Sequence, residues 1–289
     1  MASIWNEGLK GEQVMRKVIV TVALTGGFQG KEANPNLPEQ PDEISRSAYA
    51  CYNEGAAIAH IHARDKDGKP TGNADVFREI KRRIRGMCNV VLAFSTGGGI
   101  EFTKEQRIES ALADPEISSL NMGTLVRPSG AAWLNNPDLL TEWAGTLKNR
   151  GIKPELEVYG HSMFEDVHNL ISKGLVEKPY FINLVLGMKR QGALSATSKN
   201  LLSLIEYLPQ DAIFNVTAIG AMQLQLTTLG LLMGGNVRVG LEDNIYLSKG
   251  VLATNEQLVA RSVRIIRELG LEVASPAEAR QMLSLEEVS

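Results

Sequence analysis

Short apolar runs rich in β-branched residues alternate along the chain with longer stretches of helical periodicity. The first run, VIVTVAL at residues 18–24, has the continuous hydrophobicity of a strand that is buried on both faces. Eight such runs occur, and each is followed by a loop and then by an amphipathic stretch. The predicted strands lie at about residues 18–24, 57–62, 90–94, 118–122, 155–159, 180–185, 212–216 and 237–241.

The stretches between the predicted strands carry the end signals of helices. Asp42 is a candidate N-cap, and Thr103 with Gln106 forms a candidate capping box. Helices are predicted at about residues 42–54, 75–85, from 103 onward, 138–150, 162–173, 198–208, up to 233, 255–269 and 276–283. Strands that alternate with helices pair in parallel, so eight such units in 289 residues predict a (β/α)8 TIM barrel.

No linker interrupts the eight units. We therefore expect one TIM-barrel domain over residues 1–289, with a short N-terminal extension over about residues 1–16. A doubly wound parallel sheet is the alternative architecture. It is the weaker one, because STGGGIEF at residues 95–102 lacks the G-x-G-x-x-G spacing of a dinucleotide-binding turn.

Composition and charge argue against several classes of partner. The chain is 44% hydrophobic and 22% charged with a net charge of −3, and no long basic run marks a nucleic-acid interface. No apolar stretch approaches the ~20 residues that a membrane span requires, and the N-terminal residues lack the apolar core of a signal peptide. Cys51 and Cys88 form no metal or redox motif, so we expect a cytoplasmic protein.

Polar residues gather where the predicted strands end, which is the end of a TIM barrel that carries the active site. The second strand ends in HIHARD at residues 60–65, and the third ends in STGGG at residues 95–99. Ser119 and Asn121 lie on the fourth strand and could each offer a hydrogen-bond donor. The fifth strand contributes PELEVY at residues 154–159, and the last strand leads into EDN.

His60 and His62 are the strongest candidates for chemistry. Residues i and i+2 of a strand point to the same side, so both imidazoles face the barrel axis. Zinc suits imidazole nitrogens, and a catalytic zinc takes three protein ligands. Steps of two from Arg238 place Glu242 on the same inward face, which makes it the best third ligand. A hydrogen-bonded pair of core histidines is the competing interpretation.

Further charged and polar groups adjoin this predicted metal site. A buried Arg238 would hold Asp243 ionised, as a catalytic base or as half of a structural ion pair, and the spacing leaves both open. Ser95 and the turn at residues 97–99 could bind a carboxylate or phosphate through a hydroxyl and backbone N–H groups. The glycines also fit a tight turn that binds nothing.

Taken in order along the chain, the motifs resemble the β-keto acid cleavage enzymes over nearly the whole length. The shared marks are TGG near residue 25, NPNLP at 34–38, HIHARD at 60–65, STGGG at 95–99, LNMGT at 120–124, PELEVY at 154–159 and GLEDNIY at 240–246. The resemblance implies a TIM barrel with zinc held by His60, His62 and Glu242. It also implies a reaction in which a β-keto acid and acetyl-CoA give acetoacetate and a new acyl-CoA, in a homo-oligomer that is a tetramer in the family.

The resemblance also assigns roles to individual residues. Ser95 would bind the substrate carboxylate, and Asp243, oriented by Arg238, would be the base for the addition to acetyl-CoA. Glu157 matches the family glutamate of the fifth strand, and Ser119 stands where a described member has threonine. The expected catalytic residues are Arg238, Asp243 and Glu157, and the expected substrate-binding residues are Thr25, Ser95, Gly97, Gly98, Ser119 and Asn121.

This chain departs from the described family member in two loops. Phe28 or Gln29 stands where that enzyme has an acidic residue for a substrate amino group, and AIGAMQLQ after the seventh strand lacks an aromatic residue common there. We therefore expect a neutral or apolar β-keto acid. The resemblance alone implies coenzyme A binding, for which Arg127, Lys189 and Arg190 in the rim loops are candidate phosphate contacts.

Two other classes of protein compete with this interpretation. An amidohydrolase-like zinc hydrolase also uses a His-x-His pair, but it carries that pair on the first strand and needs further histidines on strands five and six. YFINLV on the sixth strand has none. His161 and His168 are expected in or near the helix after the fifth strand, without a catalytic role. A non-catalytic acid- or sugar-binding barrel would not need so many polar groups at its strand ends.

Overall fold

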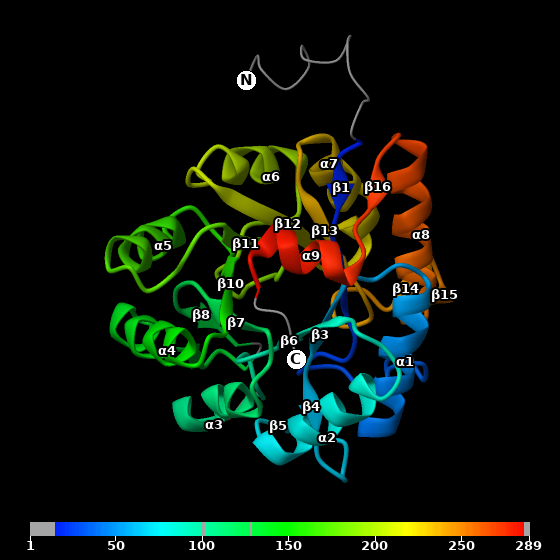
Figure 1. The fold of residues 1–289 in the computed structure, drawn as a ribbon, viewed down its shortest axis with the longest axis horizontal. Coiled ribbons are helices and arrows are strands. Elements are labelled where there is room, and N and C mark those ends of the chain that lie inside the picture. The colour runs from blue at the N-terminus through cyan, green and yellow to red at the C-terminus, as the bar shows by residue number, and fades with distance from the viewer. Residues whose placement is uncertain (1–14, 100–101, 128, 286–289) are drawn as a thin grey trace.

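The computed structural model describes residues 15–99, 102–127 and 129–285, so most of the predicted N-terminal extension lies outside the described residues. Eight parallel strands close into a barrel, and the last, β13, pairs with the first, β2 (Figure 1). In barrel order they are β2 (Val20–Ala23), β3 (Ile58–Ile61), β6 (Val91–Phe94), β7 (Ile117–Asn121), β10 (Lys153–Val158), β11 (Tyr180–Leu186), β12 (Ala212–Ala218) and β13 (Asn236–Val239). Each overlaps its predicted run, which confirms the predicted TIM barrel.

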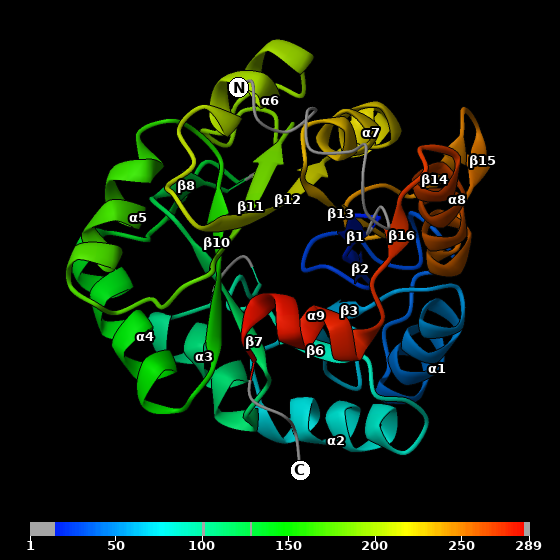
Figure 2. The ribbon, with the colours of Figure 1, turned by 45° about the horizontal axis from the view of Figure 1, so that its top comes forward.

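Helices surround the barrel (Figure 2). They are α1 (Pro41–Asn53), α2 (Ala74–Arg85), α3 (Lys104–Ile108) with the 3-10 turn η1 (Glu109–Ala113), α4 (Pro137–Asn149), α5 (Met163–Ser172), α6 (Ser198–Ile205), η2 (Gly220–Met222) with α7 (Gln223–Leu232), α8 (Asn255–Glu268) and α9 (Pro276–Leu283). The Thr103 capping box is confirmed. Asp42 is not the N-cap of α1, because the helix begins at Pro41 and the Glu43 carboxylate accepts from the Gln40 backbone N–H. None of the described helices is long and apolar enough to cross a membrane.

The helix α9 lies across the end of the barrel at which the strands begin (Figure 2). Its Ala279 and Leu283 are fully buried against Ile19, Ile58 and Ile117, which stand at or near strand starts. This apolar contact closes one mouth of the barrel, so a ligand has access from the opposite mouth.

Three short hairpins stand at the carboxyl ends of the barrel strands, and the sequence analysis did not predict them. They are β4 (Ala63–Arg64) with β5 (Pro70–Thr71), β8 (Leu125–Val126) with β9 (Ala132–Trp133), and β14 (Tyr246–Ser248) with β15 (Val251–Leu252). A fourth short pair, β1 (Lys17–Val18) with β16 (Glu272–Val273), is parallel. Strands of two or three residues carry no period-two signal, which is why the apolar pattern missed them.

Candidate active site

A cavity of about 1210 Å³ opens at the carboxyl ends of the barrel strands. It contains most of the side chains and turns that the sequence analysis singled out. The predicted site residues that line it are His60, His62, Ser95, Gly97, Gly98, Asn121, Glu157, Arg238, Glu242 and Asp243. Of the predicted site residues, Thr25 and Ser119 are buried outside its lining.

His60, His62 and Glu242 form a compact cluster in which one ligand atom from each residue lies within 4.8 Å of the others. The two imidazole Nε2 atoms stand 3.7 Å and 3.5 Å from the same Glu242 oxygen. The strand β13 ends earlier than predicted, so Glu242 reaches the cluster from the turn that follows it. The geometry brings together the three residues that the sequence analysis selected.

The cluster fits a divalent cation on two independent grounds. Its donors are two imidazoles and one carboxylate, the set that catalytic zinc takes when a further position stays open. The second oxygen of Glu242 is buried without a hydrogen-bond partner among the described residues, and a bound cation would satisfy it. Burial and the neighbouring charge of Arg238 lower the pKa of His60 to about 3, so its ring is held in the neutral form that binds metals.

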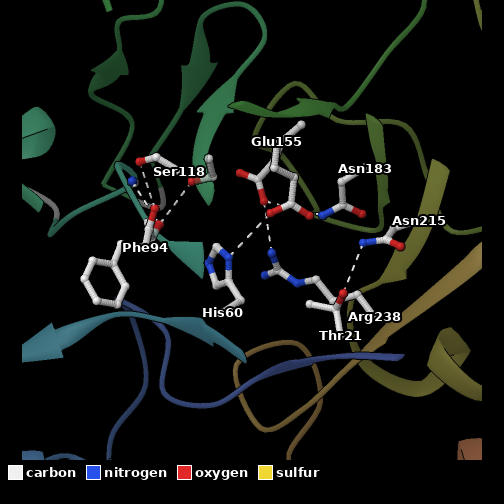
Figure 3. Close-up of polar contacts among 12 residues, drawn as sticks. Thr21, His60, Phe94, Ser118, Glu155, Asn183, Asn215 and Arg238 are labelled. Atoms are coloured by element: carbon white, nitrogen blue, oxygen red, sulfur yellow. Dashed lines mark hydrogen bonds and ion pairs between the residues drawn. The ribbon is translucent and has the colours of Figure 1, made fainter. Parts of the chain in front are cut away.

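Glu155 lies directly behind His60, and the sequence analysis gave it no role. Its carboxylate stands 3.6 Å from the His60 Nδ1 atom and is completely buried (Figure 3). Neither of its oxygens has a hydrogen-bond partner among the described residues, and burial raises its pKa to about 7. A carboxylate behind a metal-binding imidazole orients the ring and makes it a stronger ligand.

We predict that Glu155→Gln weakens zinc binding by about 10- to 100-fold, the usual effect of removing such a supporting carboxylate. Titration of metal-free protein with zinc against a chromophoric chelator measures this affinity. The amide keeps the volume of the carboxylate, so the thermal midpoint of the metal-free variant serves as the folding control. Unchanged zinc affinity in a folded variant would show that Glu155 does not support His60.

Arg238 is the only described cation in direct contact with the cluster, and it joins three carboxylates. It donates to both oxygens of Asp243 at 3.0 and 3.1 Å, to Glu157 at 3.0 Å and to Glu242 at 2.5 Å. Burial raises the pKa of Asp243 to about 7 and also raises that of Glu157. Burial acts on Glu242 in the same direction, but the charge of Arg238 holds its pKa well below the ordinary value. One arginine cannot neutralise all of these carboxylates, and this excess of negative charge favours a bound cation.

Glu157 belongs to a polar layer across neighbouring strands. Asn121 and Asn183 are its register partners on β7 and β11. Asn121 donates to Glu157 at 2.5 Å, the Tyr159 hydroxyl donates to it at 3.1 Å, and Asn183 donates to its other oxygen at 3.5 Å. The side-chain oxygen of Asn121 keeps no partner among the described residues, so it is available to a ligand in the cavity.

The Ser95 turn presents a hydroxyl and backbone groups to the cavity. Ser95 Oγ accepts from the Gly97 backbone N–H at 3.0 Å and lies 3.5 Å from Ser119 Oγ. Ser119 therefore supports the turn from behind, where it also accepts from the Thr96 N–H at 3.3 Å. The Thr25 hydroxyl is directed elsewhere and donates to the Pro38 carbonyl.

The first loop of the barrel packs directly on the metal cluster. Gly26 has a φ of +70°, and a Cβ added to it would meet the Glu242 side chain at 2.8 Å. Arg64 of the HIHARD motif donates to the carbonyls of Gly26 and Gln29 and thereby fixes this loop. The Gln29 amide in turn donates to the Leu241 carbonyl at 3.0 Å.

Arg107 was missed because an arginine on a predicted helix looks like a solvated surface residue. It is 3% exposed and donates to the Thr96 carbonyl at 3.0 Å and to the Leu134 carbonyl at 2.7 Å. Its guanidinium also lies 5.5 Å from the centre of the Trp133 ring. It therefore ties the Ser95 turn to the β8–β9 hairpin. His161 bonds Ser203 and lies outside the cavity lining.

A closed (β/α)8 barrel with a two-histidine, one-carboxylate cluster at its active end defines a barrel enzyme with a candidate metal centre. His60 lies on the second barrel strand, His62 directly follows that strand, and the sixth strand carries no histidine, which disfavours the amidohydrolase alternative. A family model described as beta-keto acid cleavage enzyme matches residues 17–285. The chain belongs to this family.

Several proteins resemble the chain. The 3-keto-5-aminohexanoate cleavage enzyme of Fusobacterium nucleatum is 38% identical over 274 residues, which are 94% of this chain and 99% of the relative. The 3,5-dioxohexanoate:acetyl-CoA acetone transferase of Paraburkholderia graminis is 32% identical over 300 residues, covering 93% and 96%. The solved apo structure of ObcA aligns with a TM-score of 0.74 at 20% identity, over 87% of this chain and 66% of that one, and shares the fold.

Proposed function

We propose that the protein condenses a β-keto acid with acetyl-CoA and releases acetoacetate and a new acyl-CoA. Membership of the family supports this, together with relatives whose names contain β-keto acids and acetyl-CoA. The observation that carries the proposal is the position of the His60, His62 and Glu242 cluster beside the Arg238–Asp243 pair, within a single cavity.

His60, His62 and Glu242 would hold zinc, which as a Lewis acid lowers the energy of negative charge developing on the keto and carboxylate oxygens. The Ser95 hydroxyl and the Gly97–Gly98 turn line the same cavity and would bind the substrate carboxylate. Glu157 is held by four side chains and would fix the orientation of Arg238.

Asp243 would act as the base. It lines the cavity, and the two bonds from Arg238 fix its orientation while leaving further lone pairs on both oxygens. It would take the proton from the carbon between the keto and carboxylate groups. The resulting carbanion attacks the acetyl thioester and releases the CoA thiolate. That thiolate attacks the original keto carbon, and the bond from this carbon to the former methylene carbon breaks. The products are the new acyl-CoA and the acetoacetate carbanion, which takes the proton back from Asp243.

The walls of the cavity favour a neutral or apolar acyl group. Phe28 packs edge-on against Trp133 at 6.1 Å, and further apolar lining comes from Val185, Met188, Ile219 and Leu224. The carboxylates among the described lining residues are Glu157, Glu242 and Asp243, and all of them bond Arg238. None is left over to pair with a substrate ammonium group.

Mass spectrometry of the zinc-loaded protein mixed with acetyl-CoA and a panel of β-keto acids tests the proposal. The expected result is acetoacetate together with an acyl-CoA matching each consumed acid, and loss of both products after chelation. Neutral acids should turn over faster than cationic ones, and the reverse order would refute the assignment of the acyl pocket. No acetoacetate from any acid, despite bound zinc, would favour a hydrolase instead.

We further propose a homotetramer that acts in the cytoplasm. Leu224, Leu232 and Met233 at and beside α7 are exposed apolar side chains and support burial against another subunit. A monomeric mass in light scattering would refute the assembly, and localisation of the labelled protein tests the compartment.

A further inference from the structure

The cavity is larger than a β-keto acid requires. Its volume of about 1210 Å³ exceeds the ~300–1,000 Å³ of ordinary small-molecule pockets. From Glu242 and Asp243 its lining continues to Ser248 and Lys249 of the β14–β15 hairpin and to Arg261 of α8. The inference below rests on the proposed function, in which acetyl-CoA brings a thioester at one end of a long arm and phosphates at the other.

Two cations stand at the outer end of this lining. Lys249 is exposed in the hairpin turn, and Arg261 is half-buried and donates to the Leu247 carbonyl at 2.5 Å. Within the described residues, neither cation has a carboxylate within 4 Å. Burial lowers the pKa of Arg261, and the charge of Arg264 acts in the same direction. A partly buried guanidinium without a counter-charge is stabilised by a bound anion.

The cations expected from the sequence to contact phosphates lie outside this cavity lining. Arg127 stacks at 5.1 Å on Trp133 and donates to the Gly99 carbonyl at 2.6 Å. Lys189 and Arg190 follow β11 and are not part of the lining. Among the described residues of the lining, the lysines and arginines are thus Lys249 and Arg261, apart from Arg238 itself.

We propose that Lys249 and Arg261 bind the phosphate groups of acetyl-CoA. The arm of the ligand would then run along the β14–β15 hairpin, with its thioester beside Asp243. Tyr246, Leu247 and Ile245 contribute apolar surface to the same wall, which suits the uncharged arm. The site therefore separates the two substrates, with the acyl group of the keto acid on the Phe28–Trp133 side and the phosphates on the hairpin side.

Calorimetric titration with CoA and with pantetheine, which lacks the phosphates, tests this assignment without requiring turnover. Lys249→Gln and Arg261→Gln are each expected to weaken CoA binding by about 10-fold or more, since each removes a charge-assisted hydrogen bond. Pantetheine binding should be unchanged in both variants. The same selectivity is expected in the KM for acetyl-CoA compared with that for acetyl-pantetheine.

Lys66→Gln is the matched control, because Lys66 is an exposed lysine in the turn of the β4–β5 hairpin at the same end of the barrel. Arg261 also holds the hairpin backbone, so Lys249→Gln, at an exposed turn, is the decisive variant. Equal losses for CoA and pantetheine, no loss for either, or a CoA-specific loss in Lys189→Gln alone would overturn the proposal. CoA binding that depends on Lys249 but gives no product would refute the proposed function and leave the phosphate site standing.

Discussion

Replacement of Arg238 by methionine is expected to abolish turnover and to lower the free energy of unfolding by about 3–5 kcal/mol. Arg238 is 3% exposed and is the shared hydrogen-bond donor to Glu157, Glu242 and Asp243. Methionine leaves these buried carboxylates with no cation. Each must then take up a proton or move toward water, and Asp243 loses the two bonds that fix its orientation.

Urea unfolding of the metal-free proteins measures the stability loss, and the acetoacetate assay measures turnover. Arg238→Lys is the matched control. Lysine keeps the positive charge but lacks the planar guanidinium group through which Arg238 donates to three carboxylates. We expect it to recover much of the stability and little of the activity. A methionine variant as stable as the native protein would show that the carboxylates are already protonated and that Arg238 does not balance them.

Glu242→Gln is expected to remove metal binding, and with it all turnover, while leaving the fold intact. Loss of a ligand should exceed the about 10- to 100-fold effect of a supporting group such as Glu155. The metal-free protein should not be destabilised, because Arg238 keeps Glu157 and Asp243 as partners and one buried negative charge is gone.

Elemental analysis after dialysis against zinc measures the loss of metal binding. Thermal unfolding of the metal-free form measures whether the fold stays intact. Glu206→Gln is a suitable control, since it changes an exposed carboxylate at the end of α6, outside the cavity lining. A Glu242→Gln protein that retains stoichiometric zinc would exclude the cluster as the metal site.

The barrel and the metal cluster could be predicted because both depend on local periodicity. Each apolar run is long enough to specify one strand, and the His-x-His spacing brings the imidazoles of His60, on β3, and His62, just after β3, into one cluster. Glu242 followed from its place at the end of the last strand, although it acts from the turn rather than from the strand itself.

The supporting residues could not be predicted, because nothing local distinguishes them. Glu155 alternates on one strand with Glu157, to which the family resemblance pointed, and only the packed barrel decides that Glu155 lies behind His60 and Glu157 beneath Arg238. Arg107 occupies an ordinary helical position, and its burial depends on Trp133 and Trp143 from the next unit of the barrel. Thr25 and Ser119 belong to site motifs, yet their hydroxyls are directed into the framework.

The strand β2 lies between β3 and β13, so the cluster bridges the seam at which the barrel closes. His62 and Glu242 are 242 − 62 = 180 positions apart in the chain. Both histidines are therefore synthesised long before Glu242, the third candidate ligand. A chain interrupted before β13 carries the imidazoles but lacks the third candidate ligand, so it would hold a cation more weakly than the finished protein. Uptake of a cation at this site would therefore follow the synthesis of β13 and the closing of the barrel.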